Sequence, residues 1–190
     1  ADTSGFNRAL KLGLSNFSTN ESGSYLEFST SLTDNHGAQI GGIRELSGSL
    51  GSAMVFRTTG TTTTANEWMR ITSTGNVGIG TTTPNSKLEV NGSATNTTAL
   101  NTVAGTSIDF SKSNLAYTTA SAGAFTLTGM KDGGTYTLAV QGGTSGTSSF
   151  TASNFTLKPY VNAETTANTH SLYTFIVMGS TIYYSMVTGL

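Results

Sequence analysis

The chain contains 190 residues, of which 36% are apolar and 10% are charged, and it has no Cys. The charges nearly cancel, giving a net charge of −1, and Lys and Arg are scattered singly, which argues against the basic surface that nucleic-acid binding needs. Nine Phe, seven Tyr and one Trp argue against disorder. Thr, Ser, Gly and Asn are abundant among the other residues, so we expect an all-β fold.

Targeting segments are not evident in the sequence. No apolar run approaches the roughly 20 residues that a membrane span needs, and the first ten residues lack the basic start and apolar centre of a signal peptide. We therefore expect no membrane insertion. Because the chain begins at Ala1 rather than Met, we also expect that it is a fragment of a longer protein.

Residues 1–92 contain short strand candidates bounded by Gly, Ser, Thr or Asn, namely Tyr25–Phe28, Met54–Arg57 and Trp68–Ile71. The stretches that join them, such as Thr58–Thr64, have no apolar periodicity, so a monomer of this half is short of core. Other copies of the chain could supply the missing buried surface, and we therefore expect a homotrimer. A loose single-chain β-domain is the alternative.

From about residue 105 the strand candidates become regular and alternate cleanly. The segment 124–128 places Phe125 and Leu127 on one face, and Asp132–Gly134 predicts a hairpin turn to the next strand, 135–141. A second hairpin is expected around Gly179 and Ser180. This pattern predicts a β-sandwich, jelly-roll-like, over 105–190, with a linker at 93–104.

One motif resembles a known family. The stretch Gly75–Pro84 (GNVGIGTTTP), followed by Lys87–Gly92, is similar to a motif of phage tail fibres and related bacterial fibre proteins, including the phage-fibre-like adhesins of predatory bacteria. The upstream segments Gln39–Arg44, Met54–Thr58 and Glu67–Ile71 recur in the same order in such fibres. The resemblance implies an intertwined homotrimeric β-shaft over 1–92, followed by a receptor-binding head at 105–190 and an extracellular location on a virion or cell surface.

The sequence offers little for catalysis. The glycines at 75, 78 and 80 match neither nucleotide-binding spacing, and the two histidines, His36 and His170, are not paired as metal ligands. Polysaccharide cleavage would need facing carboxylates, whereas Asp109, Asp132 and Glu164 are widely separated. We therefore expect no catalytic residues, no metal site and no cofactor.

Ligand binding asks less of a sequence than catalysis does. The polar stretch from Lys158 to His170 is longer than a hairpin requires and carries aromatic and amide side chains that suit a sugar. Tyr183 and Tyr184 are adjacent on a strand and must face opposite sides. The predicted ligand-binding residues are Lys158, Tyr160, Asn162, Asn168, His170 and Tyr184.

These features favour a trimeric fibre-tip adhesin that recognises a bacterial surface glycan or an envelope protein. A purely structural fibre segment without ligand binding is the alternative. A polysaccharide-degrading tailspike is a third, less favoured interpretation.

Overall fold

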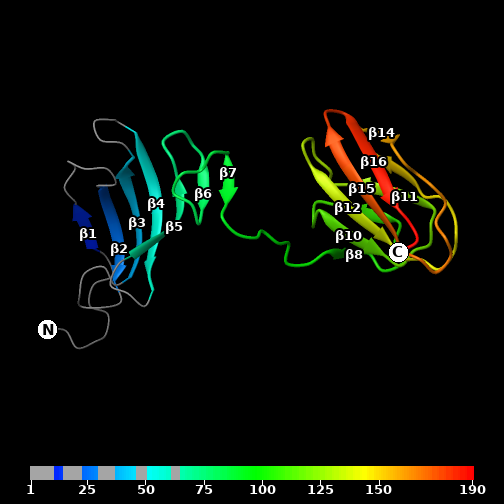
Figure 1. The fold of residues 1–190 in the computed structure, drawn as a ribbon, viewed down its shortest axis with the longest axis horizontal. Helices are drawn as coiled ribbons and strands as arrows, with labels where there is room; N and C mark the ends of the chain where they lie inside the picture. The colour runs from blue at the N-terminus through cyan, green and yellow to red at the C-terminus, as the bar shows by residue number, and fades with distance from the viewer. Residues whose placement is uncertain (1–10, 15–22, 30–36, 46–50, 61–64) are drawn as a thin grey trace. The chain divides into compact units, whose positions relative to one another are not determined.

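A computed structural model describes residues 11–14, 23–29, 37–45, 51–60 and 65–190 (Figure 1). The regular structure of this part of the chain consists of β-strands, and no helix occurs in it, which confirms the predicted all-β class. The chain divides into two compact units, Ala1–Ala94 and Thr95–Leu190.

The first unit is one seven-stranded sheet in which the strands follow their order in the sequence. Neighbouring strands pair antiparallel from β1 to β6, and β7 joins parallel to β6 (Figure 1). The three strand candidates predicted in this half all lie within its strands. The strands are β1 Lys11–Leu14, β2 Gly23–Ser29, β3 Gly37–Arg44, β4 Ser52–Thr59, β5 Ala65–Ile71, β6 Val77–Ile79 and β7 Leu88–Val90.

The glycine motif closes the last turns of this sheet. Gly75 and Gly80 have φ angles of 78° and 70°, which favour glycine because a Cβ is crowded there. The side-chain amide of Asn76 donates to the carbonyl of Pro84 at 3.1 Å and so ties the two ends of the motif together. A Cβ on Gly78 would lie 2.5 Å from the carbonyl oxygen of Thr81. The turns within one chain therefore explain why this motif contains glycine at these positions.

One face of the first sheet carries buried polar side chains. Gln39 donates to the carboxylate of Glu27 at 3.3 Å, and both are almost completely buried. Next to them in the sheet, Glu67 accepts from Arg70 at 2.6 and 3.0 Å and lies 3.6 Å from Arg57. The described apolar core of this unit is small and consists of Ile43, Ala53 and Val55.

The second unit contains two sheets and has a β-solenoid-like arrangement. Its strands are β8 Leu100–Asn101, β9 Ser107–Asp109, β10 Leu115–Thr118, β11 Ala124–Thr128, β12 Thr135–Val140, β13 Ser149–Ala152, β14 Thr156–Pro159, β15 Ser171–Met178 and β16 Thr181–Val187. The six-stranded sheet has the order β14-β16-β15-β12-β10-β8, and the three-stranded sheet has the order β13-β11-β9. Strands β8 to β13 thus alternate between the sheets. The short strand β8 lies inside the segment 93–104 that was expected to be a linker, and it pairs with β10.

Within each sheet, the alternating strands stack in parallel with like residues in line. Leu100, Ala116 and Leu138 are in register across β8, β10 and β12, and Ile108, Leu127 and Ala152 are in register across β9, β11 and β13. Each pair of successive strands adds one layer to a shared core. The long hairpin β15–β16 then pairs antiparallel with β12.

Two sequence predictions for this unit are wrong. Asp132–Gly134 does not form a hairpin turn, because β11 pairs with β9 and β13 whereas β12 pairs with β10 and β15. The turn that starts at Lys131 carries the chain from one sheet to the other instead. A jelly-roll connectivity is also ruled out, since its strands pair antiparallel and the pairs among β8–β13 are parallel. Alternation predicts which side of a strand is buried, but not which strand lies beside it.

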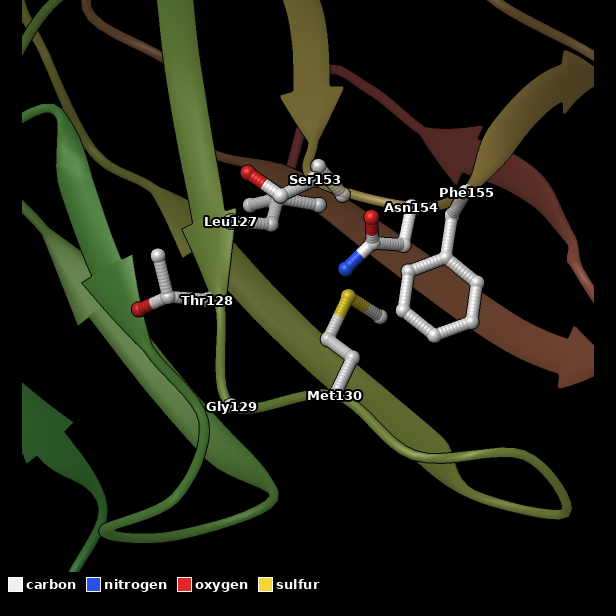
Figure 2. Close-up of a pocket in the computed structure, with 8 residues that line it drawn as sticks. Leu127, Thr128, Gly129, Met130, Ser153, Asn154 and Phe155 are labelled. Atoms are coloured by element: carbon white, nitrogen blue, oxygen red, sulfur yellow. The ribbon is translucent and has the colours of Figure 1, made fainter.

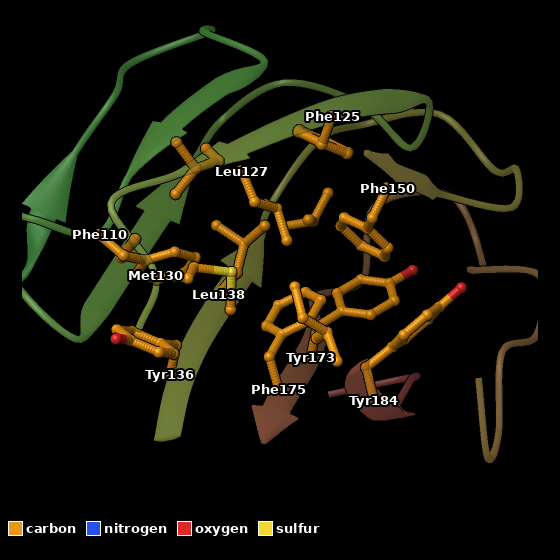
Figure 3. Close-up of a cluster of buried hydrophobic side chains, with 14 of the residues drawn as sticks. Phe110, Phe125, Leu127, Met130, Tyr136, Leu138, Phe150, Tyr173, Phe175 and Tyr184 are labelled. Atoms are coloured by element: carbon orange, nitrogen blue, oxygen red, sulfur yellow. The ribbon is translucent and has the colours of Figure 1, made fainter. Parts of the chain in front are cut away.

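The core of the second unit lies between its two sheets and is rich in aromatic rings (Figure 3). Phe150 is its hub, since its ring centroid lies 4.8 Å from that of Tyr173, 5.0 Å from Phe175 and 5.2 Å from Tyr184. The predicted inward positions Phe125, Leu127, Tyr136, Leu138 and Val140 are all buried. This core gives β15 and β16 a rigid inner support.

The closing hairpin is confirmed. Met178 pairs with Thr181 across Gly179 and Ser180, and Gly179 has a φ angle of 61°, as a tight two-residue turn requires. The hairpin strands are interior strands of the six-stranded sheet. Of the adjacent tyrosines, Tyr184 packs into the core whereas Tyr183 is exposed on the outer face.

Candidate ligand site on the six-stranded sheet

An edge strand positions the most exposed aromatic ring of the second unit. β14 pairs parallel with β16, and the backbone N–H groups of Thr156 and Tyr160 donate to Ser180 and Tyr184 at 2.8 and 2.7 Å. Pro159 falls between these donors, at a position that faces away from β16, so its missing N–H breaks no ladder bond. The main chain of Tyr160 is therefore fixed while its side chain remains 87% exposed.

A pocket of about 220 Å³ opens on the outer face of the sheet beside Tyr160. Tyr183 stands opposite Ile176 in the pairing of β16 with β15, and Ser185 stands opposite Thr174. The pocket thus combines two tyrosines and an aliphatic side chain with two hydroxyl groups. It is lined by Tyr160, Thr174, Ile176, Tyr183, Tyr184 and Ser185.

One strand of the sheet places a positively charged side chain near this pocket. Among the residues of the six strands, Lys158 carries the only charge, and it lies opposite Tyr183 in the β14–β16 pairing. Its side chain is exposed. The pocket thus has an aromatic and hydroxyl lining with a cation at its rim, a combination that suits the apolar faces and hydroxyl edges of a sugar.

The structure brings together three of the six predicted ligand-binding residues. Lys158, Tyr160 and Tyr184 lie at or beside the pocket, although the ring of Tyr184 points into the core against Phe150 and Phe175 (Figure 3). Tyr183 provides the exposed ring on this strand. The sequence analysis did not choose between the two tyrosines, although alternation carries the signal. The residues two positions from Tyr184 are the apolar Ile182 and Met186, whereas those two positions from Tyr183 are the polar Thr181 and Ser185.

The other three predicted residues lie along the loop that joins β14 to β15. The amide of Asn162 donates to the carbonyl of Ser148 at 3.0 Å, which anchors the loop. Asn168 is exposed and has a φ angle of 60°. The main chain of His170 exchanges two hydrogen bonds with Leu190, and His170 precedes Thr174 by four residues, or roughly 13 Å along the strand.

The same loop is held in the middle by a bridge between Thr165 and Gly146. The Thr165 hydroxyl also donates to the Gly146 carbonyl at 2.9 Å, and Thr165 is buried. The loop that was predicted to form a single site with Tyr160 is therefore directed toward the far end of β15. His36, the other histidine considered as a polar surface residue, lies outside the described residues.

A second pocket, of about 250 Å³, lies at the end of the three-stranded sheet (Figure 2). Gly129 and Asn154 turn the chain there with φ angles of 72° and 69°. Figure 2 shows the side chains of Met130, Asn154 and Phe155 at this pocket, which all three line. This pocket has no exposed aromatic ring and no charged residue in its lining, so it is the weaker candidate.

Two of the acidic groups considered for catalysis support turns instead. Asp109 accepts from the backbone N–H of Ser111 at 3.0 Å, and hydrogen bonds from Ser111 lower the pKa of its carboxyl. Asp132 accepts from the backbone N–H of Gly179 at 2.7 Å. Glu164 is exposed in the loop after β14. Within the described ranges, no group of three His, Asp or Glu side chains is arranged to hold a metal ion.

No protein-family model matches the chain, and no curated protein is significantly similar to it. In the part of the chain that the structure describes, no helix is long and apolar enough to cross a membrane.

Proposed function

We propose that this chain is an adhesin of an extracellular trimeric fibre, and that its second unit binds a glycan or another envelope receptor on a bacterial surface. The observation that carries the proposal is the pocket beside Tyr160. Two exposed tyrosines, a threonine and a serine hydroxyl meet there on strands held by an aromatic core. Such a surface stacks on a pyranose ring and hydrogen-bonds its hydroxyls.

Weak binding at each site is sufficient in this proposal. A homotrimer presents three copies of the pocket, and the second and third contacts become intramolecular once the first has formed. Extracellular location and trimeric assembly rest on the likeness of the Gly75–Pro84 motif to fibre proteins. The rigid backbone around the pocket supports a preformed site, which lowers the entropy cost of binding.

The test is binding of the full chain to an array of bacterial surface glycans and to isolated envelopes. Tyr160→Ala and Tyr183→Ala are each expected to weaken monovalent binding about tenfold, equivalent to about 1.4 kcal/mol. Tyr117→Ala is the matched control, since Tyr117 lies on the same sheet in β10, three strands from β16. Binding that survives both pocket substitutions would refute the site.

The same experiment separates the competing interpretations. A trimer that binds no envelope component would favour a structural fibre segment. Release of reducing sugar from envelope polysaccharide, with loss of that release in Asp109→Asn or Glu164→Gln, would favour the tailspike interpretation.

A further inference from the structure

The two faces of the seven-stranded sheet differ sharply in chemistry. One face carries the buried polar side chains around Glu27 and Arg70, together with the small buried cluster Ile43, Ala53 and Val55. The opposite face, which we call the apolar face, carries a row of apolar residues that crosses six strands in register. From β2 to β7 the row consists of Leu26, Ile40, Phe56, Met69, Ile79 and Val90.

A second row runs parallel to the first on the same face. Met54, Ile71, Val77 and Leu88 are in register across β4, β5, β6 and β7. From β4 to β7 the apolar face therefore consists of two parallel rows of apolar side chains. Among the described strand residues on this face, the one that carries a charge is Arg44, at the end of β3.

A β-bulge adds the tryptophan to this face. The pairing of β4 with β5 shifts between Phe56 and Arg57, so Arg57 pairs with Glu67 and not with Trp68. The shift lets Glu67 reach the ion pairs of the polar face. Trp68 turns the other way, and its indole N–H donates to the hydroxyl of Thr58 at 2.8 Å. Bulges of this kind re-aim a side chain at a defined place.

The apolar face is open to solvent over an area at the upper end of what monomeric proteins expose. Six of its large side chains are between 39% and 62% exposed, namely Phe28, Ile40, Met54, Trp68, Ile79 and Leu88. If each of these large side chains has an area on the order of 200 Å², the six together leave on the order of 600 Å² of apolar surface open. That equals the largest patches on typical monomers and approaches the ~800 Å² per partner of a stable interface.

We infer that the apolar face is the surface through which copies of this chain pack against one another. This inference rests on the proposed homotrimer and assigns its interface. Identical copies fit this face because three apolar surfaces with almost no charge bring no like charges together when they meet around a three-fold axis. A charged partner would gain nothing from it, since the ion pairs of the sheet lie on the other face.

The first measurement is the mass of the full chain in solution by light scattering. The wild-type chain is expected at about three times its 19.6 kDa mass. Ile40→Asp and Ile79→Asp are each expected to reduce the mass to that of one chain, because assembly would bury the new carboxylate in an apolar interface. Thr82→Asp is the matched control in an exposed loop of the same unit and is expected to leave the mass unchanged.

Thiol labelling keeps the inference testable if the charged variants fail to fold. The chain has no Cys, so Met54→Cys introduces a single thiol. In the assembled protein this thiol is expected to react with a maleimide at least tenfold more slowly than that of Thr82→Cys, and equally fast after denaturation. Equal rates in the native protein would overturn the inference.

The outcomes also separate this interface from the proposed function. A trimer whose mass is unchanged by Ile40→Asp and Ile79→Asp overturns the interface and leaves trimeric adhesion intact. A monomeric wild-type chain overturns both the interface and the trimer. Loss of glycan binding in Tyr160→Ala with an unchanged mass concerns the pocket alone, because the pocket lies within the second unit of one chain.

Discussion

Lys158 and Tyr183 face each other across the parallel pairing of β14 with β16, so a cation and an exposed aromatic ring share the rim of the pocket. If a glycan binds there, a carboxylate or phosphate substituent on it gains a charge-assisted contact with Lys158. Lys158→Gln is therefore expected to weaken binding of acidic glycans about five- to tenfold, or about 1 kcal/mol, and to leave neutral glycans unaffected.

Salt dependence provides the check on that prediction. Binding of acidic glycans to the wild-type chain is expected to weaken as salt rises from 0.05 to 0.5 M, because exposed charges are screened, whereas Lys158→Gln should show little salt dependence. Lys112→Gln, which removes an exposed cation outside the six-stranded sheet, is the control. Equal losses for neutral and acidic glycans would contradict the electrostatic role.

The sequence was a good guide to strands and to their buried sides, and a poor guide to their neighbours. The inward positions Phe125 and Leu127 follow from alternation, which is local. The partner of their strand does not, because segment 129–134 is long enough to cross from one sheet to the other, whereas the two residues Gly179 and Ser180 can only reverse the chain within a sheet.

The candidate site was predictable to a similar extent. Tyr160 could be singled out because it follows a proline at the end of a strand in a polar stretch. Its neighbours Thr174 and Ser185 could not, because their closeness depends on the register of β14, β15 and β16. The bridge from Thr165 to Gly146 also depends on tertiary contacts, and it separates Asn168 and His170 from the pocket.

Ionisation of Tyr173 is expected to reduce the stability of the second unit at alkaline pH. Burial raises the pKa of its phenol above the ordinary value of 10.0, and the nearby Ser148 offsets only part of that effect. A pKa that is higher in the folded than in the unfolded chain means that the stabilisation is complete below about pH 10 and is lost as pH rises through the folded pKa. The denaturation midpoint of the wild-type chain is therefore expected to fall above pH 10.

Tyr173→Phe is expected to reduce this fall, since the variant has no phenol to ionise at that position. At neutral pH it should be as stable as the wild-type chain or more stable, because the Tyr173 oxygen is buried without a hydrogen bond of normal geometry. Tyr183→Phe, at an exposed position, is the control. A pH profile identical in the wild-type chain and Tyr173→Phe would show that another group sets the limit.

Gly142 marks a place where neighbouring layers of the second unit touch. It is buried just after β12, and a Cβ there would collide with the backbone of Ser121 and the carbonyl of Ala120, which follow β10. Gly142→Ala is expected to cost about 3 kcal/mol, because backbone has to move. Gly133 has a φ angle of 78° but open space around it, so Gly133→Ala should cost only about 1 kcal/mol. Urea denaturation followed by circular dichroism measures both, and equal costs would contradict the close approach.

Glu67 holds two arginines on the polar face of the first sheet, and removing its charge tests how far that unit depends on them. Glu67 accepts two hydrogen bonds from Arg70 and lies beside Arg57, and the side chains of Glu67 and Arg70 are only 10% and 6% exposed. Glu67→Gln removes the negative charge that faces the buried guanidinium of Arg70, so we expect a loss of about 3–5 kcal/mol.

The neighbouring Trp68 reports this loss directly, since it is the only tryptophan in the chain and belongs to the same strand. Its fluorescence is expected to show the first unit unfolding at a lower urea concentration in Glu67→Gln, while the tyrosine-rich second unit unfolds as before. Glu45→Gln, which alters an exposed contact with Ser73, is the control and should cost less than about 1 kcal/mol. If Glu67→Gln costs no more than this control, the ion pairs are dispensable and the bulge in β5 serves mainly to place Trp68 on the apolar face.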